Sequence, residues 1–361
     1  MRKPQLEIYY PYPFGEAAAQ RFRIEQYLPY LQANFEIKIR PFWSKSAWKI
    51  LYLKGHFIQK SFGLFSGFFR RIFWLLPAIR ADYIYIFREA TPIGPPFVEW
   101  FLAKILRKKI IYDFDDAIWL PNQSEVNRRV VKHLKYHAKV GRICSWAYRV
   151  SVGNDFLATY ARQFNPQVVV IPTTIDTENL HHPAFQVKKA NPFPIIGWTG
   201  THSTLQHLDI LWPVLDALIL EIPFEFHLIS DDFPREKRDY VRHIPWKKAS
   251  EIADLMRFDV GVMPLYNTEW EKGKCGFKLL QYMALEIPSI ASDVGVNREI
   301  IHNPELGFLI TDNDPAEWKN AFIQLLSDKG LRKDIGIKSR KRVIDAYSVR
   351  ANKEKVVGLF R

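Results

Sequence analysis

The sequence predicts an α/β protein built from two domains, each with a doubly wound parallel sheet. Short apolar runs alternate with longer amphipathic stretches along the whole chain, which is the pattern of parallel strands joined by crossover helices. A chain of 361 residues, 48% of them hydrophobic, is also long enough for two or three domains with cores of their own. Together these two observations favour two sheets over one.

The predicted strands fall into two groups separated by a proline-rich, polar stretch. They span residues 6–10, 35–39, 83–87, 109–113, 149–152 and 168–171 in the first half, and residues 195–198, 224–228, 260–264, 289–291 and 307–310 in the second. Residues 181–194 break the alternation and are the predicted linker. We therefore expect an N-terminal domain over residues 1–180 and a C-terminal domain over residues 195–345.

Charge is distributed unevenly between the two halves. The formal net charge is +13, and residues 1–180 hold 26 Lys and Arg against 14 Asp and Glu, whereas residues 181–361 hold 25 against 24. Nearly all of the excess positive charge therefore lies in the first half. A one-sided basic field indicates an anionic partner such as a membrane surface, a phosphate-bearing acceptor or a nucleic acid.

The densest basic region spans residues 42–80, with seven Lys or Arg, no Asp or Glu, and eleven aromatic residues. Its uncharged runs, residues 61–69 and 72–79, are much shorter than the ~20 residues that a membrane-spanning helix needs. Interleaved basic and aromatic residues are typical of a segment that lies in a membrane interface. Core helices with solvated basic faces are the alternative, but the aromatic residues exceed what one helix face can bury. We predict docking on an anionic membrane surface.

Two cysteines, Cys144 and Cys275, lie far apart and form no metal-ligand motif. This argues against a disulfide framework and a structural zinc site, and it fits a reducing cytoplasm. The chain begins Met1-Arg-Lys and continues into a mixed strand instead of the apolar core of a signal peptide. We therefore expect a cytoplasmic protein.

A glycine-containing turn precedes a short helix and a buried strand within residues 273–292. Gly273 and Gly276 punctuate the turn, and apolar residues follow at helical spacing until Pro288. Such a turn offers free N–H groups and the positive end of a helix dipole, which suits a phosphate. Lys272, Lys274 and Lys278 flank this turn with cations. An ordinary loop and helix of an α/β domain is the alternative.

A similar layout opens the second domain, where a strand, a glycine, a cluster of hydroxyl groups and a helix follow one another. The candidate phosphate-facing residues are Thr199, Gly200, Thr201 and His202.

Two motifs in the first half follow predicted strands and are candidates for binding an acceptor. Arg21 and Arg23 begin the predicted helix after the first strand. A positive charge at the start of a helix is repelled by the helix dipole. Binding of phosphate or of an anionic acceptor therefore explains the two arginines better than exposure to solvent does. Asp113, Asp115 and Asp116 close another strand. Their mutual repulsion requires a partner, which can be a metal ion, acceptor hydroxyl groups or, for one of them, a helix N-terminus. Arg88 and Glu89, after the strand at residues 83–87, are further acceptor candidates.

Five short blocks carry a family resemblance. They are Asp-Val-Gly-Val-Met-Pro at residues 259–264, Lys-Cys-Gly-Phe-Lys-Leu-Leu-Gln-Tyr-Met-Ala-Leu at 274–285, Pro-Ser-Ile-Ala-Ser at 288–292, Val-Gly-Val-Asn-Arg-Glu-Ile-Ile at 294–301 and Gly-Phe-Leu at 307–309. In this order they resemble the donor-binding half of the family 4 glycosyltransferases, which are retaining enzymes with the two-domain GT-B fold. Weaker matches extend over nearly the whole chain.

The resemblance implies two Rossmann-like domains that face a cleft, and a C-terminal helix over residues 346–361 that packs back on the N-terminal domain. It implies transfer of a sugar from a nucleoside-diphosphate donor of the UDP or GDP type, with retention of configuration and without a metal ion or other cofactor. The implied acceptor is a lipid-linked molecule or polysaccharide in cell-surface glycan synthesis. A protein of this kind acts at the inner face of the cell membrane as a peripheral enzyme.

The resemblance also assigns roles to individual residues. The implied donor-binding residues are Gly15, Thr199, Gly200, Thr201, Lys274, Gly276, Phe277, Lys278 and Gln281. Asp115, Asp116 and Lys278 are the candidate catalytic residues, because the first two can bind the acceptor hydroxyl or take its proton and Lys278 can stabilise the departing diphosphate. Arg21, Arg23, Arg88, Glu89 and Asp115 are assigned to the acceptor.

The chain departs from the family pattern in its donor-binding residues. The usual arginine after the first strand of the second domain and the lysine on the next turn are missing, so we predict that Lys274 and Lys278 carry the charge opposite the diphosphate. The family's Glu-x7-Glu pair stands here as Gly273 and Gln281, with Glu269 and Glu271 nearby. Gln281 can still bond a ribose hydroxyl as donor and acceptor.

One further departure concerns the end of the helix. Glu286 stands where a helix-ending glycine is usual, which predicts some loss of stability.

A retaining glycosyltransferase is the function that the sequence predicts. A nucleotide-sugar epimerase or hydrolase of the same shape is the first alternative, and a non-catalytic partner subunit is the second, because the Glu-x7-Glu pair is lost. A nucleic-acid binder would account for the basic first half but not for the donor blocks in the nearly neutral second half.

Overall fold

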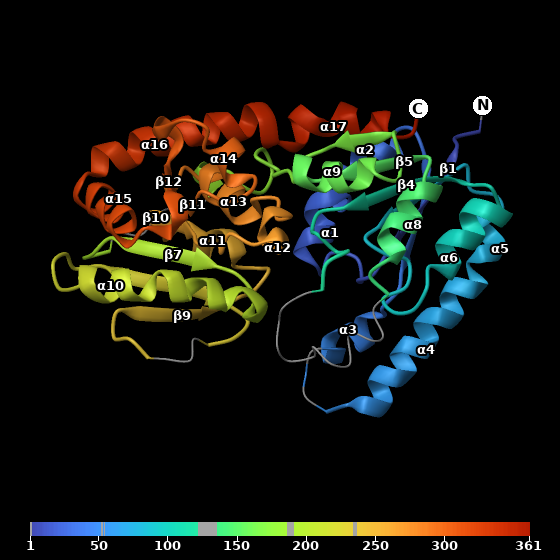
Figure 1. Cartoon of the computed structure of the whole chain (residues 1–361), viewed down its shortest axis with the longest axis horizontal. Coiled ribbons are helices and arrows are strands. Elements are labelled where there is room, and N and C mark those ends of the chain that lie inside the picture. Colours follow the sequence, from blue (N-terminus) through green and yellow to red (C-terminus); the bar gives the residue numbers. More distant parts are fainter. Residues whose placement is uncertain (1, 52, 54, 122–135, 186–190, 234–236) are drawn as a thin grey trace. The chain divides into compact units, whose positions relative to one another are not determined.

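The computed structural model describes residues 2–51, 53, 55–121, 136–185, 191–233 and 237–361. The chain forms two compact units, of which unit 1 comprises residues 1–173 and 352–361 and unit 2 comprises residues 174–351. Figure 1 shows that each unit has a central sheet with helices packed around it. The predicted linker at residues 181–194 belongs to unit 2 in this division, and residues 186–190 lie outside the described part of the chain.

Unit 1 contains a six-stranded parallel sheet in the order β2-β1-β3-β4-β5-β6. Its strands are β1 (Gln5–Tyr10), β2 (Glu36–Pro41), β3 (Tyr83–Phe87), β4 (Lys109–Phe114), β5 (Arg149–Val152) and β6 (Val168–Val170). The chain first winds from β1 to β2 and then reverses direction to build β3 on the other side of β1. In an open parallel sheet, ligands bind at the carboxyl ends of the strands that flank such a reversal. The loops after β1 and β3 are therefore the expected site in this unit.

Unit 2 contains a second six-stranded parallel sheet in the order β12-β11-β10-β7-β8-β9. Its strands are β7 (Ile195–Thr199), β8 (Glu225–Ser230), β9 (Val241–Pro245), β10 (Val260–Met263), β11 (Ser289–Ser292) and β12 (Phe308–Ile310). Here the direction reverses between β7 and β10, which is the strand order of dinucleotide-binding Rossmann domains. The loops that follow β7 and β10 therefore mark the expected site in this unit.

Helices connect the strands and cover the sheets. Those of unit 1 are α1 (Ala18–Arg23), α2 (Leu28–Gln32), α3 (Lys45–Leu51), α4 (Phe57–Phe73), α5 (Leu75–Ala78), α6 (Phe97–Trp100), α8 (Lys139–Trp146) and α9 (Asp155–Arg162). Those of unit 2 are the 3₁₀ helix η5 (His202–Ile210) and α10 (Trp212–Leu218), α11 (Glu251–Leu255), α12 (Glu269–Lys272), α13 (Phe277–Ala284), α14 (Asn297–Ile300), α15 (Pro315–Ser327) and α16 (Lys329–Arg342). The final helix, α17 (Val349–Gly358), runs from unit 2 into unit 1.

The predicted strands agree with the structure to within two residues at each end, and one strand was missed. All eleven predicted runs are strands, but β9 has no counterpart among them. β9 lies at the edge of its sheet, and its two adjacent polar residues, Arg242 and His243, interrupt the apolar pattern. Its residues are half-buried or exposed, because an edge strand has a neighbouring strand on one side only, and it therefore carries a weak apolar signal.

The last ten residues of the chain belong to the core of unit 1. The Phe360 ring is almost fully buried and packs against the rings of Phe35 and Tyr83, with centroids 5.2 and 5.6 Å away. The side chain of Arg149 donates to the Gly358 carbonyl at 2.5 Å, and the Tyr148 hydroxyl donates to the Arg361 carbonyl at 3.1 Å. The C-terminal segment thus completes the domain that the N-terminus begins.

Helix α4 carries a large exposed apolar face. Gly63 and Gly67 lie one turn apart on its buried side, where an added Cβ would come within 2.8 Å of Ala47 and 2.5 Å of Phe42. Arg71 continues this buried side and donates to the carbonyl oxygens of Tyr10, Arg40 and Ala90. The opposite side and the following helix leave apolar side chains more than half exposed: Phe57, Ile58, Phe62, Phe65, Phe69, Ile72, Phe73, Leu76 and Ile79. Within the described ranges, no helix is both long and apolar enough to span a membrane.

Candidate functional site

In unit 2, the turn before α13 lies after β10, beside the point where the strand order reverses. Gly276 has a left-handed backbone conformation with φ of +66° and precedes the first residue of the helix, Phe277. The positive φ favours glycine, and a Cβ at this position would lie 2.3 Å from Cδ1 of Ile300 on α14, so that the end of the Ile300 side chain would have to move. The turn therefore brings the N-terminus of α13 to the ligand-binding edge of the sheet.

Lys278 lies in the first turn of α13. Its ammonium lies 4.7 Å from the centroid of the Trp198 ring, which comes from the neighbouring strand β7. The side chain is half-buried. Burial and the positive charge of Lys274 lower the pKa of Lys278 to about 7. Lys274 and Lys278 repel each other, and this repulsion favours negative charge at this part of the turn.

The loop after β7 uses its amides within the protein. The Thr199 N–H donates to the Tyr282 hydroxyl at 3.0 Å, and the Gly200 N–H donates to the Ile229 carbonyl at 3.0 Å. Gly200 is required sterically, since a Cβ would lie 2.3 Å from the Trp198 ring. The hydroxyl of Thr201 lies 2.9 Å from that of Ser203. Any contact with a ligand would therefore come from the side chains here rather than from the two amides.

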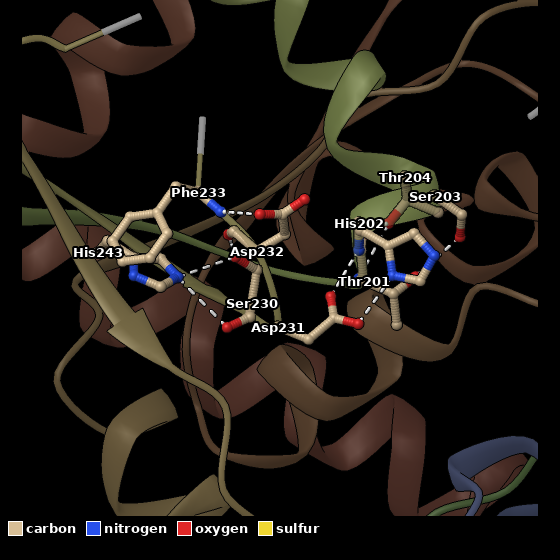
Figure 2. A network of polar contacts seen from close by, with 9 residues as sticks. All are labelled: Thr201, His202, Ser203, Thr204, Ser230, Asp231, Asp232, Phe233 and His243. Carbon is tan, nitrogen blue, oxygen red and sulfur yellow. Dashed lines mark hydrogen bonds and ion pairs between the residues drawn. The ribbon is translucent and has the colours of Figure 1, made fainter. Parts of the chain in front are cut away.

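His202 forms a polar pair that the sequence did not reveal. Its N–H donates to one carboxylate oxygen of Asp231 at 2.6 Å, and its Nδ1 lies 2.8 Å from the other (Figure 2). Asp231 directly follows β8, next to Ser230, whose hydroxyl lies 3.1 Å from Nε2 of His243. The position of Asp231 at the carboxyl end of a predicted strand was the signal that could have identified it. The pair fixes the first residue of η5 against the neighbouring loop.

Gln281 lies on the buried side of α13. Its amide nitrogen is 3.3 Å from Oε1 of Glu251 and 3.2 Å from Nε2 of His181. The side chain is thus held within unit 2 in the absence of a ligand, and its contact with a ribose stays a prediction.

In unit 1, a cation meets each of the three clustered carboxylates at the end of β4. Arg88 has a left-handed backbone with φ of +59°, and its side chain bonds Asp115 at 2.7 Å and Asp116 at 2.5 Å. Burial raises the pKa of the Asp115 carboxyl, whereas the charge of Arg88 acts in the opposite direction. A strained residue that joins two carboxylates at the carboxyl ends of β3 and β4 is typical of a functional site.

Arg23 is placed differently from the sequence prediction. Its side chain is buried and pairs with Asp113, while also bonding Ser151 and the carbonyl of Ile171. An arginine enclosed in this way holds the strand ends of unit 1 together and is not exposed to an acceptor. Arg21 is half-buried, and its guanidinium lies 5.0 Å from the centroid of the Phe22 ring.

Two other predicted residues of unit 1 are engaged by neighbouring side chains. Gly15 has φ of +78°, and its N–H donates to both oxygens of Glu25, at 2.9 and 3.1 Å. Glu89 pairs at 2.8 Å with the nearly buried ammonium of Lys139. The Gly15 amide thus binds an anionic group, but that group is a carboxylate of the protein.

The described residues contain no cluster of three or more His, Cys, Asp or Glu side chains that could hold a metal ion. Asp115 and Asp116 are bridged by Arg88, as described above. The acceptor role of these carboxylates stays a prediction.

The two parallel six-stranded sheets have the topology of GT-B proteins, and solved structures show the same fold. A sucrose-phosphate synthase from Thermosynechococcus elongatus superposes with a TM-score of 0.73 at 16% identity, covering 99% of this chain and 98% of that one. Anabaena HepE, solved in complex with UDP-glucose, superposes with a TM-score of 0.69 at 14% identity, covering 98% of both chains. The fold is therefore GT-B, as the sequence predicted.

The second unit also has a recognisable family signature. Residues 193–328 match the model of the family described as glycosyl transferases group 1. A D-inositol 3-phosphate glycosyltransferase from Paenarthrobacter aurescens is 31% identical over 99 residues. That alignment covers 27% of this chain and 23% of the relative.

Proposed function

We propose that this protein is a glycosyltransferase that moves a sugar from a nucleoside-diphosphate donor, of the UDP or GDP type, to an acceptor hydroxyl. The observation that carries the proposal is the convergence of Lys274, Lys278 and the N-terminus of α13 at the reversal point of the unit 2 sheet, inside the matched segment. A pyrophosphate is the ligand that such an arrangement suits. HepE, with the same fold, binds UDP-glucose.

The chemistry proposed for this site is mainly electrostatic. When the bond between sugar and phosphate breaks, negative charge develops on the departing diphosphate and positive charge on the sugar. Lys278, Lys274 and the amides at the start of α13 stabilise the leaving group without a metal ion or other cofactor. The departing phosphate accepts the acceptor's proton on the same face, which gives retention of configuration. Asp115 and Asp116, held by Arg88, orient the acceptor hydroxyl.

Binding and turnover test the proposal. A thermal-shift series with UDP, GDP and their sugars should show one nucleotide class that raises the unfolding temperature, because a ligand that binds only the native state stabilises it. Transfer is then measured with the selected donor, in the presence and absence of EDTA. Hydrolysis or epimerisation without an acceptor would favour the first alternative function. No stabilisation by any nucleotide sugar would favour a non-catalytic partner subunit.

We further propose that unit 1 docks on an anionic membrane to reach a lipid-linked acceptor. The proposal rests on the exposed apolar face of α4 and α5 together with the basic residues of the same segment. Lys45, Lys49 and Arg80 are exposed, and residues 42–80 contain no acidic residue that would repel anionic lipid. A helix that buries glycines and exposes aromatic residues has its apolar side toward the outside of the unit.

A second segment extends the same kind of surface. Phe97, Trp100 and Ile105 are exposed, and Lys104 lies among them. The segment is fastened to the end of α5 by Lys108, whose ammonium donates to the carbonyls of Ile79 at 2.7 Å and Ala81 at 2.9 Å. Aromatic and basic side chains from two segments would thus enter the interface together.

Vesicle sedimentation tests membrane docking. The protein should bind anionic vesicles strongly and neutral ones weakly, and salt should reduce binding without abolishing it. Serine at Phe62, Phe65 and Phe69 should remove the salt-resistant part. Phe68 and Trp74 are poor choices for substitution, because the Phe68 ring packs on Phe42 and the Trp74 ring lies against the guanidinium groups of Arg40 and Arg71. Leu220→Ser, at an exposed leucine of unit 2, is the matched control. If the wild-type protein does not sediment with anionic vesicles at low salt, membrane docking is ruled out and a soluble acceptor is favoured.

A further inference from the structure

A buried pair of side chains lies directly behind the proposed donor turn. Glu271, in the last turn of α12, accepts from His207 of η5, with Nε2 3.0 Å from Oε1. The other oxygen of Glu271 accepts from the Thr268 hydroxyl. Only 2% of the His207 side chain and 8% of the Glu271 side chain are exposed. The sequence pointed to Glu271 only as a carboxylate near Gly273, and it gave no indication of His207.

The pair connects the elements that follow the two strands at the reversal point. η5 follows β7, and α12 follows β10. A second contact runs parallel to it, since the Tyr266 hydroxyl donates to the Gln206 carbonyl at 3.2 Å and the Tyr266 ring lies 5.7 Å from that of His207. The start of the donor turn is therefore joined to η5 at two points.

The turn between Glu271 and Gly276 is also confined on its other sides. The Lys274 N–H donates to the Glu271 carbonyl at 3.0 Å, so the backbone of Lys274 is set by that of Glu271. Gly295, with φ of +55°, approaches so closely that an added Cβ would lie 3.1 Å from Cα of Lys272. A turn held in this way has few alternative positions, and movement of Glu271 would be passed on to Lys274.

The charge state of the pair is determined by its surroundings. Burial lowers the pKa of His207, the charges of Lys278 and Lys274 lower it further, and the bond to Glu271 only partly opposes them. His207 is therefore neutral at pH 7 and donates its Nε2–H to the carboxylate, while its Nδ1 has no hydrogen-bond partner among the described residues. Glu271 stays ionised, because the bonds from His207 and Thr268 lower its pKa more than burial raises it. A carboxylate with both oxygens engaged is poorly suited to bind a sugar but well suited to hold a turn.

We infer that Glu271 and His207 are positioning residues that hold the Lys272–Gly276 turn so that Lys274 meets the donor diphosphate. This inference rests on the proposed donor site. The inference also accounts for the absence of a carboxylate at residue 273. The carboxylate of Glu271, two residues earlier, holds the turn in place and does not bind the sugar.

The experiment measures the affinity for UDP and GDP by calorimetry, together with thermal unfolding of each variant. Glu271→Ala should weaken nucleotide binding about ten- to hundredfold, because small displacements of a binding group have effects of this size. Glu271→Gln can keep both contacts, because its amide oxygen accepts from His207 and its amide nitrogen donates to the Thr268 hydroxyl, and it should stay within about fivefold of wild type. His207→Phe keeps the ring but loses Nε2 and should resemble Glu271→Ala, which keeps the test decisive if the alanine variant does not fold. Glu269→Ala, at an exposed carboxylate of the same short helix, is the matched control and should change affinity less than about twofold.

A double-mutant cycle separates positioning from general stability. In a Lys274→Ala background, Glu271→Ala should have almost no further effect on affinity, because the two residues act through one contact. Unchanged affinity in Glu271→Ala and His207→Phe, with only a lower unfolding temperature, would overturn the inference, as would full additivity with Lys274→Ala. If the wild-type protein binds neither nucleotide, the proposed function itself fails, and this outcome is distinct from the first two.

Discussion

At the scale of single residues, the three aspartates at the end of β4 have different environments although they are neighbours in the sequence. Asp113 pairs with buried Arg23 inside unit 1, whereas Asp115 and Asp116 share Arg88 near the strand ends. The first pair is a structural contact, and the second is the proposed acceptor site.

Amide substitutions should distinguish the two kinds of aspartate. Asp115→Asn and Asp116→Asn should leave nucleotide binding intact while kcat falls about a hundredfold or more, the usual size of a lost acid–base or orienting group. Asp113→Asn should instead lower the free energy of unfolding by about 3–5 kcal/mol, because it leaves the Arg23 charge buried without its partner. Calorimetry, initial rates and urea unfolding provide the three measurements. Loss of nucleotide binding in Asp115→Asn, or an activity that strictly needs Mg²⁺, would indicate a metal role.

Lys278 is the residue proposed to stabilise the negative charge of the departing diphosphate. Lys278→Ala should slow transfer about ten- to a thousandfold, equivalent to about 1.4–4 kcal/mol of lost transition-state stabilisation. Because the Lys278 side chain is half-buried on Trp198, the unfolding temperature of the variant needs to be measured alongside its rate. Transfer at the native rate would contradict the assignment.

The lowered pKa of Lys278 predicts a pH dependence of donor binding. The pKa is about 7 without ligand, and the diphosphate must raise it, since an anion favours the charged form. Binding therefore takes up a proton above pH 7, and affinity for the nucleotide sugar should fall with rising pH, by up to about tenfold per unit. Lys278→Arg, which stays charged, should remove this slope between pH 7 and 8.5. An equally steep slope in the arginine variant would assign the proton to another group.

At the scale of elements, the end of α13 is strained. Glu286 follows the helix with φ of +60°, a conformation that favours glycine. The sequence predicted a cost at this position from the residue type alone, and the backbone angle gives the physical reason.

Replacing Glu286 by glycine should stabilise the protein. The left-handed conformation costs a residue with a Cβ about 1 kcal/mol or more, and the greater freedom of glycine in the unfolded chain offsets part of the gain. We expect a net increase of about 0.5–1 kcal/mol in the free energy of unfolding, measured from the urea midpoint. The nearest cation, Arg340, lies 3.9 Å from the carboxylate, so little is lost with the charge. A clear loss of stability would show that this weak pair matters more than the backbone strain.

At the scale of the whole molecule, the chain passes from unit 1 to unit 2 and returns to unit 1 for its last ten residues. Phe360 is the principal contact of this return, since its ring packs against the rings of Phe35, Tyr83 and Tyr85.

Phe360→Ala should therefore weaken unit 1 selectively. Removing a buried phenylalanine costs about 3–5 kcal/mol. Hydrogen exchange should show faster opening at β1 and β3, while β7 and β10 of unit 2 keep their protection. Phe233→Ala, at an exposed phenylalanine of unit 2, is the control. Equal loss of protection in both sheets would mean that the units unfold as one cooperative body.

The sequence by itself determined the fold class and the position of eleven strands, because the period of apolar residues is a local property that burial imposes on each element. It also located the turn at Gly276, since glycine is the residue that adopts a left-handed backbone conformation most readily. The resemblance carried by residues 259–309 led to the GT-B fold. What the sequence left open was which polar side chains meet.

Only the tertiary structure decided those pairings. The sequence assigned both Arg23 and Arg88 to the acceptor. In the structure, Arg23 is buried and pairs with Asp113, whereas Arg88 joins Asp115 to Asp116. His207 and Glu271 are 64 residues apart and meet because β7 and β10 are neighbours in the sheet. Likewise, the aromatic residues of α4 divide into packed and exposed ones according to where Gly63 and Gly67 touch the rest of unit 1. Such contacts depend on strand order and helix orientation, which are properties of the whole fold and are not encoded in any local pattern.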